Sequence, residues 1–88
     1  MSFKGYFTTL NVQEIYRTAI NLQPIEKRDC LQFLITFYFK RHRIYTCKPN
    51  QDLLDQSIQE STIMPTNLLN QEINSWLCRL ILIDSYYN

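Results

Sequence analysis

The sequence predicts an all-α fold, a compact bundle of three to four helices, on three observations. The chain of 88 residues contains only one glycine, Gly5, whereas the tight turns of β-hairpins commonly need glycine at positive φ. Apolar side chains recur at helical spacing in several segments. Three prolines, Pro24, Pro49 and Pro65, stand where helices are expected to begin or end, because proline disfavours a helix interior. The predicted helices cover residues 11–22, 24–43, 51–60 and 66–84.

The first two predicted helices have recognisable starts. Asn11 is a candidate N-cap, and Glu14 follows three residues later in a variant of the capping box. Pro24 suits the first turn of the second helix, and Glu26 close behind it suits the positive end of the helix dipole. The residues expected on the buried face of the first helix are Val12, Ile15, Ala19 and Leu22.

The third predicted helix is short and the fourth is long. Asn50 is a candidate cap for the third helix, whose apolar stripe is Leu53, Leu54 and Ile58. In the fourth helix a 4-3-4-3 spacing defines a seam that packs on other helices. The residues of this seam are Leu69, Ile73, Trp76, Leu80 and Ile83. We expect the second and fourth helices to form the central hairpin of the bundle.

Residues 33–39, "FLITFYF", carry an alternative interpretation. They are aromatic and β-branched enough to form a buried strand, which would give an α+β fold. A helix is favoured by continuity from Pro24 and by the helical spacing of Leu31, Leu34 and Tyr38. Turn residues are also absent between Arg28 and Lys48.

Composition places the chain among small folded proteins. With 45% hydrophobic and 19% charged residues, it is too apolar for the intrinsically disordered class. Its length suffices for one domain, residues 1–88, and leaves no room for a second core. Twelve aromatic residues are more large apolar surface than a small monomer easily buries, which favours a partner protein or a homo-oligomer.

The net charge of +1 conceals an asymmetry between the two halves of the chain. Up to Gln51, eight lysines and arginines stand against three acids, which gives +5; from Asp52 onward, Arg79 alone stands against five acids, which gives −4. The halves are expected to attract each other within the fold or between subunits. The near-neutral sum argues against a dedicated DNA-binding protein.

The cysteines and the first residues of the chain bear on its location. Cys30, Cys47 and Cys78 form an odd, widely spaced set without a CxxC pair, and the first residues lack the apolar segment of a signal peptide. We therefore expect a cytoplasmic protein with free thiols. Cys30 and Cys78 lie in apolar runs, where they are expected to be buried.

No signature of catalysis, metal binding or cofactor binding stands out. Cys47 lies beside Lys48 and near His42, which would lower the pKa of its thiol, but a third orienting group is missing. A zinc site would need ligands from three separate segments, so we expect neither a metal nor a cofactor. The uncharged run 30–39 has ten residues, about half the length that a membrane-spanning helix needs, and we expect no such helix.

The candidate contact surface is the basic end of the second helix together with the last tyrosines. Its residues are Lys40, Arg41, His42, Arg43, Tyr45, Lys48, Tyr86 and Tyr87. Cations near the C-terminus of a helix also offset its negative end without any ligand, and this explanation stays open. We expect a non-enzymatic protein–protein interaction module, such as an adaptor, inhibitor or accessory subunit, whose partner is an acidic protein surface or a second copy. The alternative is a small nucleic-acid-binding regulator that uses the basic cluster at residues 40–48.

Overall fold

The structure is a computed structural model that describes residues 12–46 and 51–87, apart from the side chains of residues 12, 13, 45 and 84–87. Within these ranges the chain forms four helices and no strand. The helices are α2 (Val12–Ile20), α3 (Pro24–Thr46), α4 (Gln51–Ile63) and α5 (Thr66–Tyr87). The predicted all-α bundle is confirmed. The alternative strand at residues 33–39 is wrong, because this stretch lies inside α3 and packing of its apolar side chains overrides their β-propensity.

Local hydrogen bonds explain where the helices end. α2 stops two residues before the predicted end, where the backbone N–H of Asn21 donates to the carbonyl of Thr18 over 3.2 Å. The side-chain amide of Asn21 also donates to the carbonyl of Arg17, 3.0 Å away, and so satisfies one carbonyl of the last turn. α3 continues three residues beyond the predicted end, to Thr46, whose hydroxyl donates to the carbonyl of His42 over 2.8 Å.

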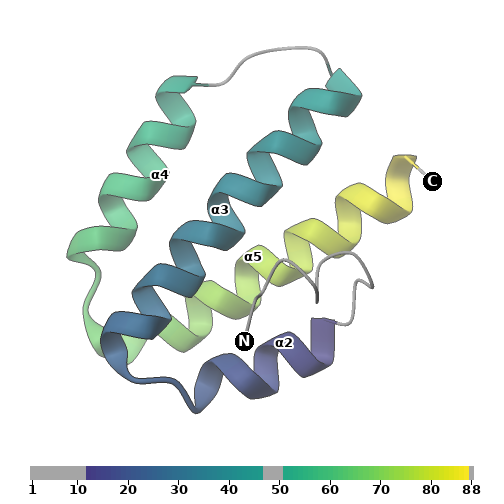
Figure 1. The fold of residues 1–88 in the computed structure, drawn as a ribbon. Coiled ribbons are helices and arrows are strands. Elements are labelled where there is room, and N and C mark those ends of the chain that lie inside the picture. The colour runs from purple at the N-terminus through teal and green to yellow at the C-terminus, as the bar shows by residue number, and fades with distance from the viewer. Residues whose placement is uncertain (1–11, 47–50, 88) are drawn as a thin grey trace.

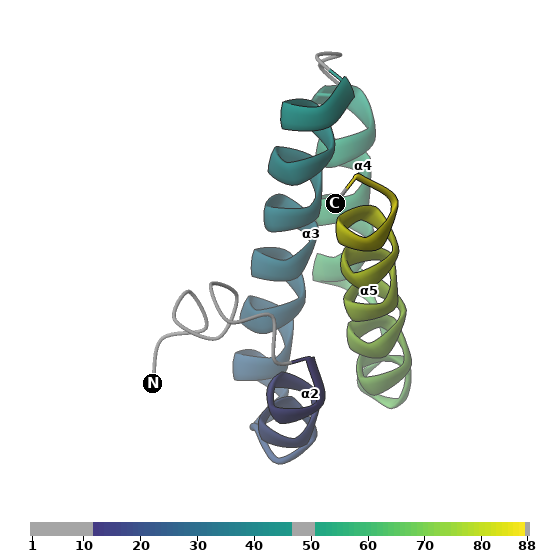
Figure 2. The same cartoon turned by 90° about the vertical axis from the view of Figure 1, so that its right-hand side faces the viewer.

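The core lies mainly between α3 and α5, which make the most extensive contact in the bundle. α3 lies at the centre with α4 along one side and α2 beneath its N-terminal end (Figure 1), and α5 packs against it as a second layer (Figure 2). The predicted seam of α5 is buried along its whole length. The buried core residues are Ile15 and Ala19 from α2, Cys30, Leu31, Leu34 and Ile35 from α3, and Leu69, Ile73, Trp76, Leu77, Leu80 and Ile83 from α5.

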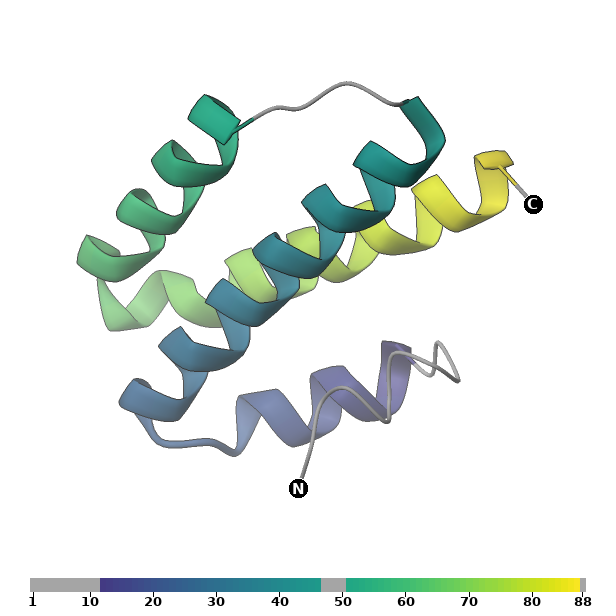
Figure 3. The same ribbon diagram turned by 45° about the horizontal axis from the view of Figure 1, so that its top comes forward.

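α4 is packed differently from the other helices. Its one buried residue is Ser61, while Leu54 and Ile58 are only half-buried against the core. Leu53, which was predicted to share the apolar stripe of this helix, is 52% exposed. α4 makes its main contact with α3. α4 and α5 meet at the turn between them and then diverge (Figure 3).

Hydrogen bonds from α3 hold the C-terminal end of α4. Nη1 of Arg28 donates to the carbonyls of Ser61 and Thr62, each 3.2 Å away. These are two of the carbonyls that a helix end leaves without a partner in the helix. The amide of Gln32 adds a bond of 3.2 Å to the hydroxyl of Thr62. α4 is therefore anchored by polar contacts at the end where it approaches α5.

Candidate functional site

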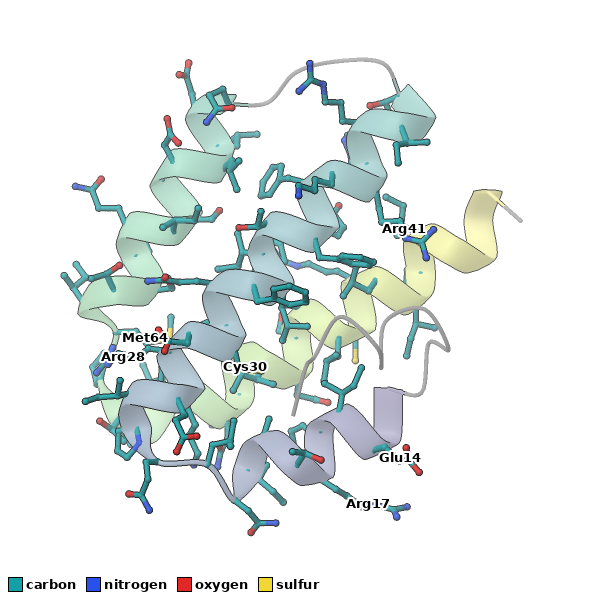
Figure 4. The ribbon with its side chains drawn as sticks, viewed as in Figure 1. Glu14, Arg17, Arg28, Cys30, Arg41 and Met64 are labelled. Carbon is teal, nitrogen blue, oxygen red and sulfur yellow. The ribbon has the colours of Figure 1, made fainter. Side chains whose placement is uncertain are left out.

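The predicted basic surface is divided among different sides of α3. Lys40 and Arg43 are exposed, and His42 is half-buried. The guanidinium of Arg41 lies 5.3 Å from the centre of the Phe37 ring, on the side of α3 that faces the viewer's right in Figure 4. Successive residues of a helix are turned by about 100°, so Arg41 lies about 160° around the helix from Arg43. Of the remaining predicted contact residues, Lys48 lies outside the described residues, as does Cys47, and the side chains of Tyr45, Tyr86 and Tyr87 are outside the described part of the structure.

An exposed apolar side chain lies next to the two exposed cations. Ile44 is 70% exposed, four residues after Lys40 and directly after Arg43. Lys40 and Arg43 have no hydrogen-bond or ion-pair partner among the described residues. We call these three residues, Lys40, Arg43 and Ile44, the basic outer face.

The extended length of α3 bears on what these cations do. The favourable effect of a helix C-terminus on a cation falls off within the last turn. α3 ends at Thr46, so Arg43 lies in its last turn but Lys40 does not. Compensation of the helix dipole therefore explains why a cation stands at position 43, but it does not explain the cation at position 40.

A second surface feature was not predicted from the sequence. A hollow of about 310 Å³ lies where α3, α4 and α5 meet, and a neighbouring hollow of about 190 Å³ shares Ser57, Trp76 and Arg79 with it. The two hollows adjoin at these shared residues, and together we call them the α4–α5 groove. Tyr38, Phe39, His42 and Leu53 line its wider part.

Aromatic side chains form the wall of the wider part of the groove. Trp76 meets Tyr38 edge-on, with ring centres 5.3 Å apart, and Phe39 at a tilt, with centres 6.1 Å apart. The guanidinium of Arg79 lies 4.2 Å from the centre of the Trp76 ring, which is cation–π geometry. Trp76 was predicted to belong to the core, and at 5% exposed it does. No pattern in the sequence indicates the groove, because the groove depends on how far α4 and α5 diverge.

The described cysteines differ from each other. Cys30 is buried, and removal from water raises the pKa of its thiol from 9.0 to about 12. Cys78 was predicted to be buried but is exposed, because the α5 seam through Trp76 and Leu80 turns it away from α3. Among the described residues, no group of three or more His, Cys, Asp or Glu side chains lies close enough together to hold a metal ion.

Comparison of the chain with models of protein families, with curated proteins and with solved structures gave no match. Within the described ranges, none of the helices combines the length and the apolar character that crossing a membrane requires.

Proposed function

We propose that the chain is a non-enzymatic protein–protein interaction module whose basic outer face docks on an acidic surface of another protein. The observation that carries this proposal is the exposure of Ile44 beside two exposed cations, Lys40 one turn before it and Arg43 directly before it. An apolar side chain that becomes buried supplies affinity, while the flanking cations orient an acidic partner and accelerate its association.

The charge distribution supports a partner outside the bundle. The acids of the second half of the chain include Asp52 and Asp55 in α4, yet no described acid pairs with Lys40 or Arg43. The described acids of the second half therefore do not occupy these cations within the fold. The free thiols of Cys30 and Cys78 support a reducing compartment such as the cytoplasm as the place of action.

Site-specific photo-crosslinking in the native host tests this function. A benzoylphenylalanine residue replaces Ile44 in one version of the tagged chain and Ile63 in the matched control, since Ile63 of α4 is also largely exposed, at 79%. We expect one protein to be crosslinked from position 44 but not from position 63. The crosslinked peptide should map to an acidic surface, and Lys40→Glu with Arg43→Glu should abolish the product.

The affinity of the isolated partner then separates protein docking from nucleic-acid binding. Ile44→Ala should weaken binding about tenfold, because an apolar anchor buried at an interface is lost. Crosslinks to nucleic acid, or affinity that Ile44→Ala leaves unchanged and that falls steeply with salt, would replace this function by the nucleic-acid alternative. Equal crosslinking from both positions would remove the basic outer face as a docking surface.

A further inference from the structure

The α4–α5 groove has walls that repeat at helical spacing. Leu53, Ser57 and Glu60 contribute the α4 side, and Glu72, Trp76 and Arg79 contribute the α5 side. Both sets follow the i, i+4, i+7 pattern of a single helix face. The lining on this side continues to Met64, directly after the end of α4, so its first and last residues are eleven positions apart, or about 16 Å at 1.5 Å per residue. This length matches about three turns of a helix laid along the groove.

Charged residues of opposite sign line different parts of the groove. Glu60 and Glu72 line the narrower end near Met64, whereas Arg79 lines both parts and is the charged residue of the wider end. Arg79 stacks on Trp76 but has no ion pair among the described residues. Since one face of its guanidinium is covered by the indole, its N–H groups are held ready for a carboxylate.

The wider part of the groove has apolar side chains in its lining and is open to solvent. Leu53 is 52% exposed although it lines the same hollow as the aromatic side chains of Tyr38 and Phe39. A large apolar side chain from outside would be surrounded by these three residues. Grooves that take an amphipathic helix have this composition, an apolar pocket with charged groups at its edge.

From this arrangement we infer that the α4–α5 groove binds a short amphipathic helix of a partner protein. The helix presents a carboxylate to Arg79, a large apolar side chain to the hollow beside Leu53, and a lysine or arginine to Glu60 and Glu72. Glu72 and Arg79 are seven residues apart on α5, so the two charges of the bound helix are also about seven residues apart.

The direction of the bound helix follows from its own charges. An isolated helix is stabilised by acids near its N-terminus and by cations near its C-terminus. The acidic N-terminal turn therefore lies at Arg79 and the basic C-terminal turn lies at Glu72, which makes the bound helix antiparallel to α5. The expected pattern is an acid, a large apolar residue three or four positions later, and a cation at the seventh position.

A displayed library of 15-residue, alanine-rich helical peptides tests the inference on the full chain. Three positions, spaced i, i+4 and i+7, are randomised without tryptophan or cysteine. Because Trp76 is the single tryptophan of the chain and lines the groove, its fluorescence reports binding of a synthesised peptide directly. We expect enrichment of acid–apolar–cation peptides, and a matched peptide with the acid and the cation exchanged should bind at least tenfold more weakly.

Substitutions in the chain then locate the site. Leu53→Glu should weaken the selected peptide at least tenfold, while Ile63→Glu, at an exposed α4 position that does not line the groove, should leave it unchanged. Arg79→Glu should weaken the acid-first peptide and favour the exchanged one, with Arg79→Gln as the milder variant should charge reversal disturb the fold. Far-UV circular dichroism of each variant establishes that the helices persist.

Each outcome has a defined meaning. Lys40→Glu with Arg43→Glu should leave peptide binding unchanged. The proposal for the basic outer face and the proposal for the groove can therefore fail independently of each other. The inference is overturned if no common pattern is enriched, or if Leu53→Glu and Arg79→Glu leave binding intact. It is equally overturned if Trp76 fluorescence changes with protein concentration alone and Leu53→Glu abolishes that change, because a second copy would then occupy the groove.

Discussion

Replacement of Arg28 by methionine should release the end of α4 from α3. Methionine retains an unbranched, largely apolar stem but has no donor for the carbonyls of Ser61 and Thr62. In the structure one nitrogen of Arg28 serves both carbonyls, at 3.2 Å each. The positive charge at this end of α4, where Figure 4 shows Arg28 beside Met64, also offsets the helix dipole.

The expected loss is about 1 to 2 kcal/mol of unfolding free energy. A typical hydrogen bond contributes about 0.5 to 1.5 kcal/mol net, and a cation at a helix C-terminus about 0.3 to 1 kcal/mol. Since Thr62 is exposed, water replaces part of the lost bonding, which keeps the sum low. With an unfolding entropy of about 2.1 cal/mol/K per residue, this loss lowers Tm by about 5 to 11 °C.

Thermal unfolding followed by far-UV circular dichroism measures the effect. Arg17→Met is the matched control, because Arg17 lies exposed on α2 and points away from the bundle (Figure 4). This control should change the unfolding free energy by less than about 0.5 kcal/mol. If Arg28→Met and Arg17→Met lower Tm equally, the hydrogen bonds of Arg28 do not hold α4 and the reasoning fails.

Two further predictions concern the core. Trp76→Ala should lower the free energy of unfolding by about 3 to 5 kcal/mol, because a buried indole that contacts Tyr38 and Phe39 is lost. Leu82→Ala, at a position 67% exposed, should lower it by less than about 0.5 kcal/mol, and urea unfolding measures both values. Similar losses for the two variants would contradict the assigned core. In mass-spectrometric mapping of maleimide labelling at pH 7.5, Cys78 should react and Cys30 should stay protected until urea is added, since burial raises the pKa of Cys30 to about 12. Equal labelling of both thiols in the folded protein would show that Cys30 is accessible.

The sequence predicted the helices well where their packing face is long. In α5 the spacing of Leu69, Ile73, Trp76, Leu80 and Ile83 identifies the buried seam whatever the partner helix is, and all five are buried. The predicted positions of the helix ends were less accurate. They depend on individual hydrogen bonds, such as those of the Asn21 side chain, that apolar periodicity does not reveal.

The candidate site was predicted in part. The exposure of Lys40 and Arg43 follows from their place on α3, and helix geometry alone separates them from Arg41. The groove could not be predicted, because it arises from the separation of α4 and α5, and no residue pattern within one helix reports the distance to another. Leu53 shows the consequence, since it was expected to pack with Leu54 and instead lines an open hollow.

The composition of α4 explains why this hollow stays open. Between Leu53 and Met64, the residues of α4 that line the groove opposite α5 are Ser57, Glu60 and Ser61, none of which has a large apolar side chain. A leucine at position 57 or 60 would reach Trp76 and draw the two helices together, because apolar surface on both sides favours contact. The short and charged side chains give no such gain, so α4 packs mainly on α3 and the indole is left at the wall of a groove. The opening is thus a property of the α4 sequence, whereas the stability of the bundle rests mainly on α3 and α5.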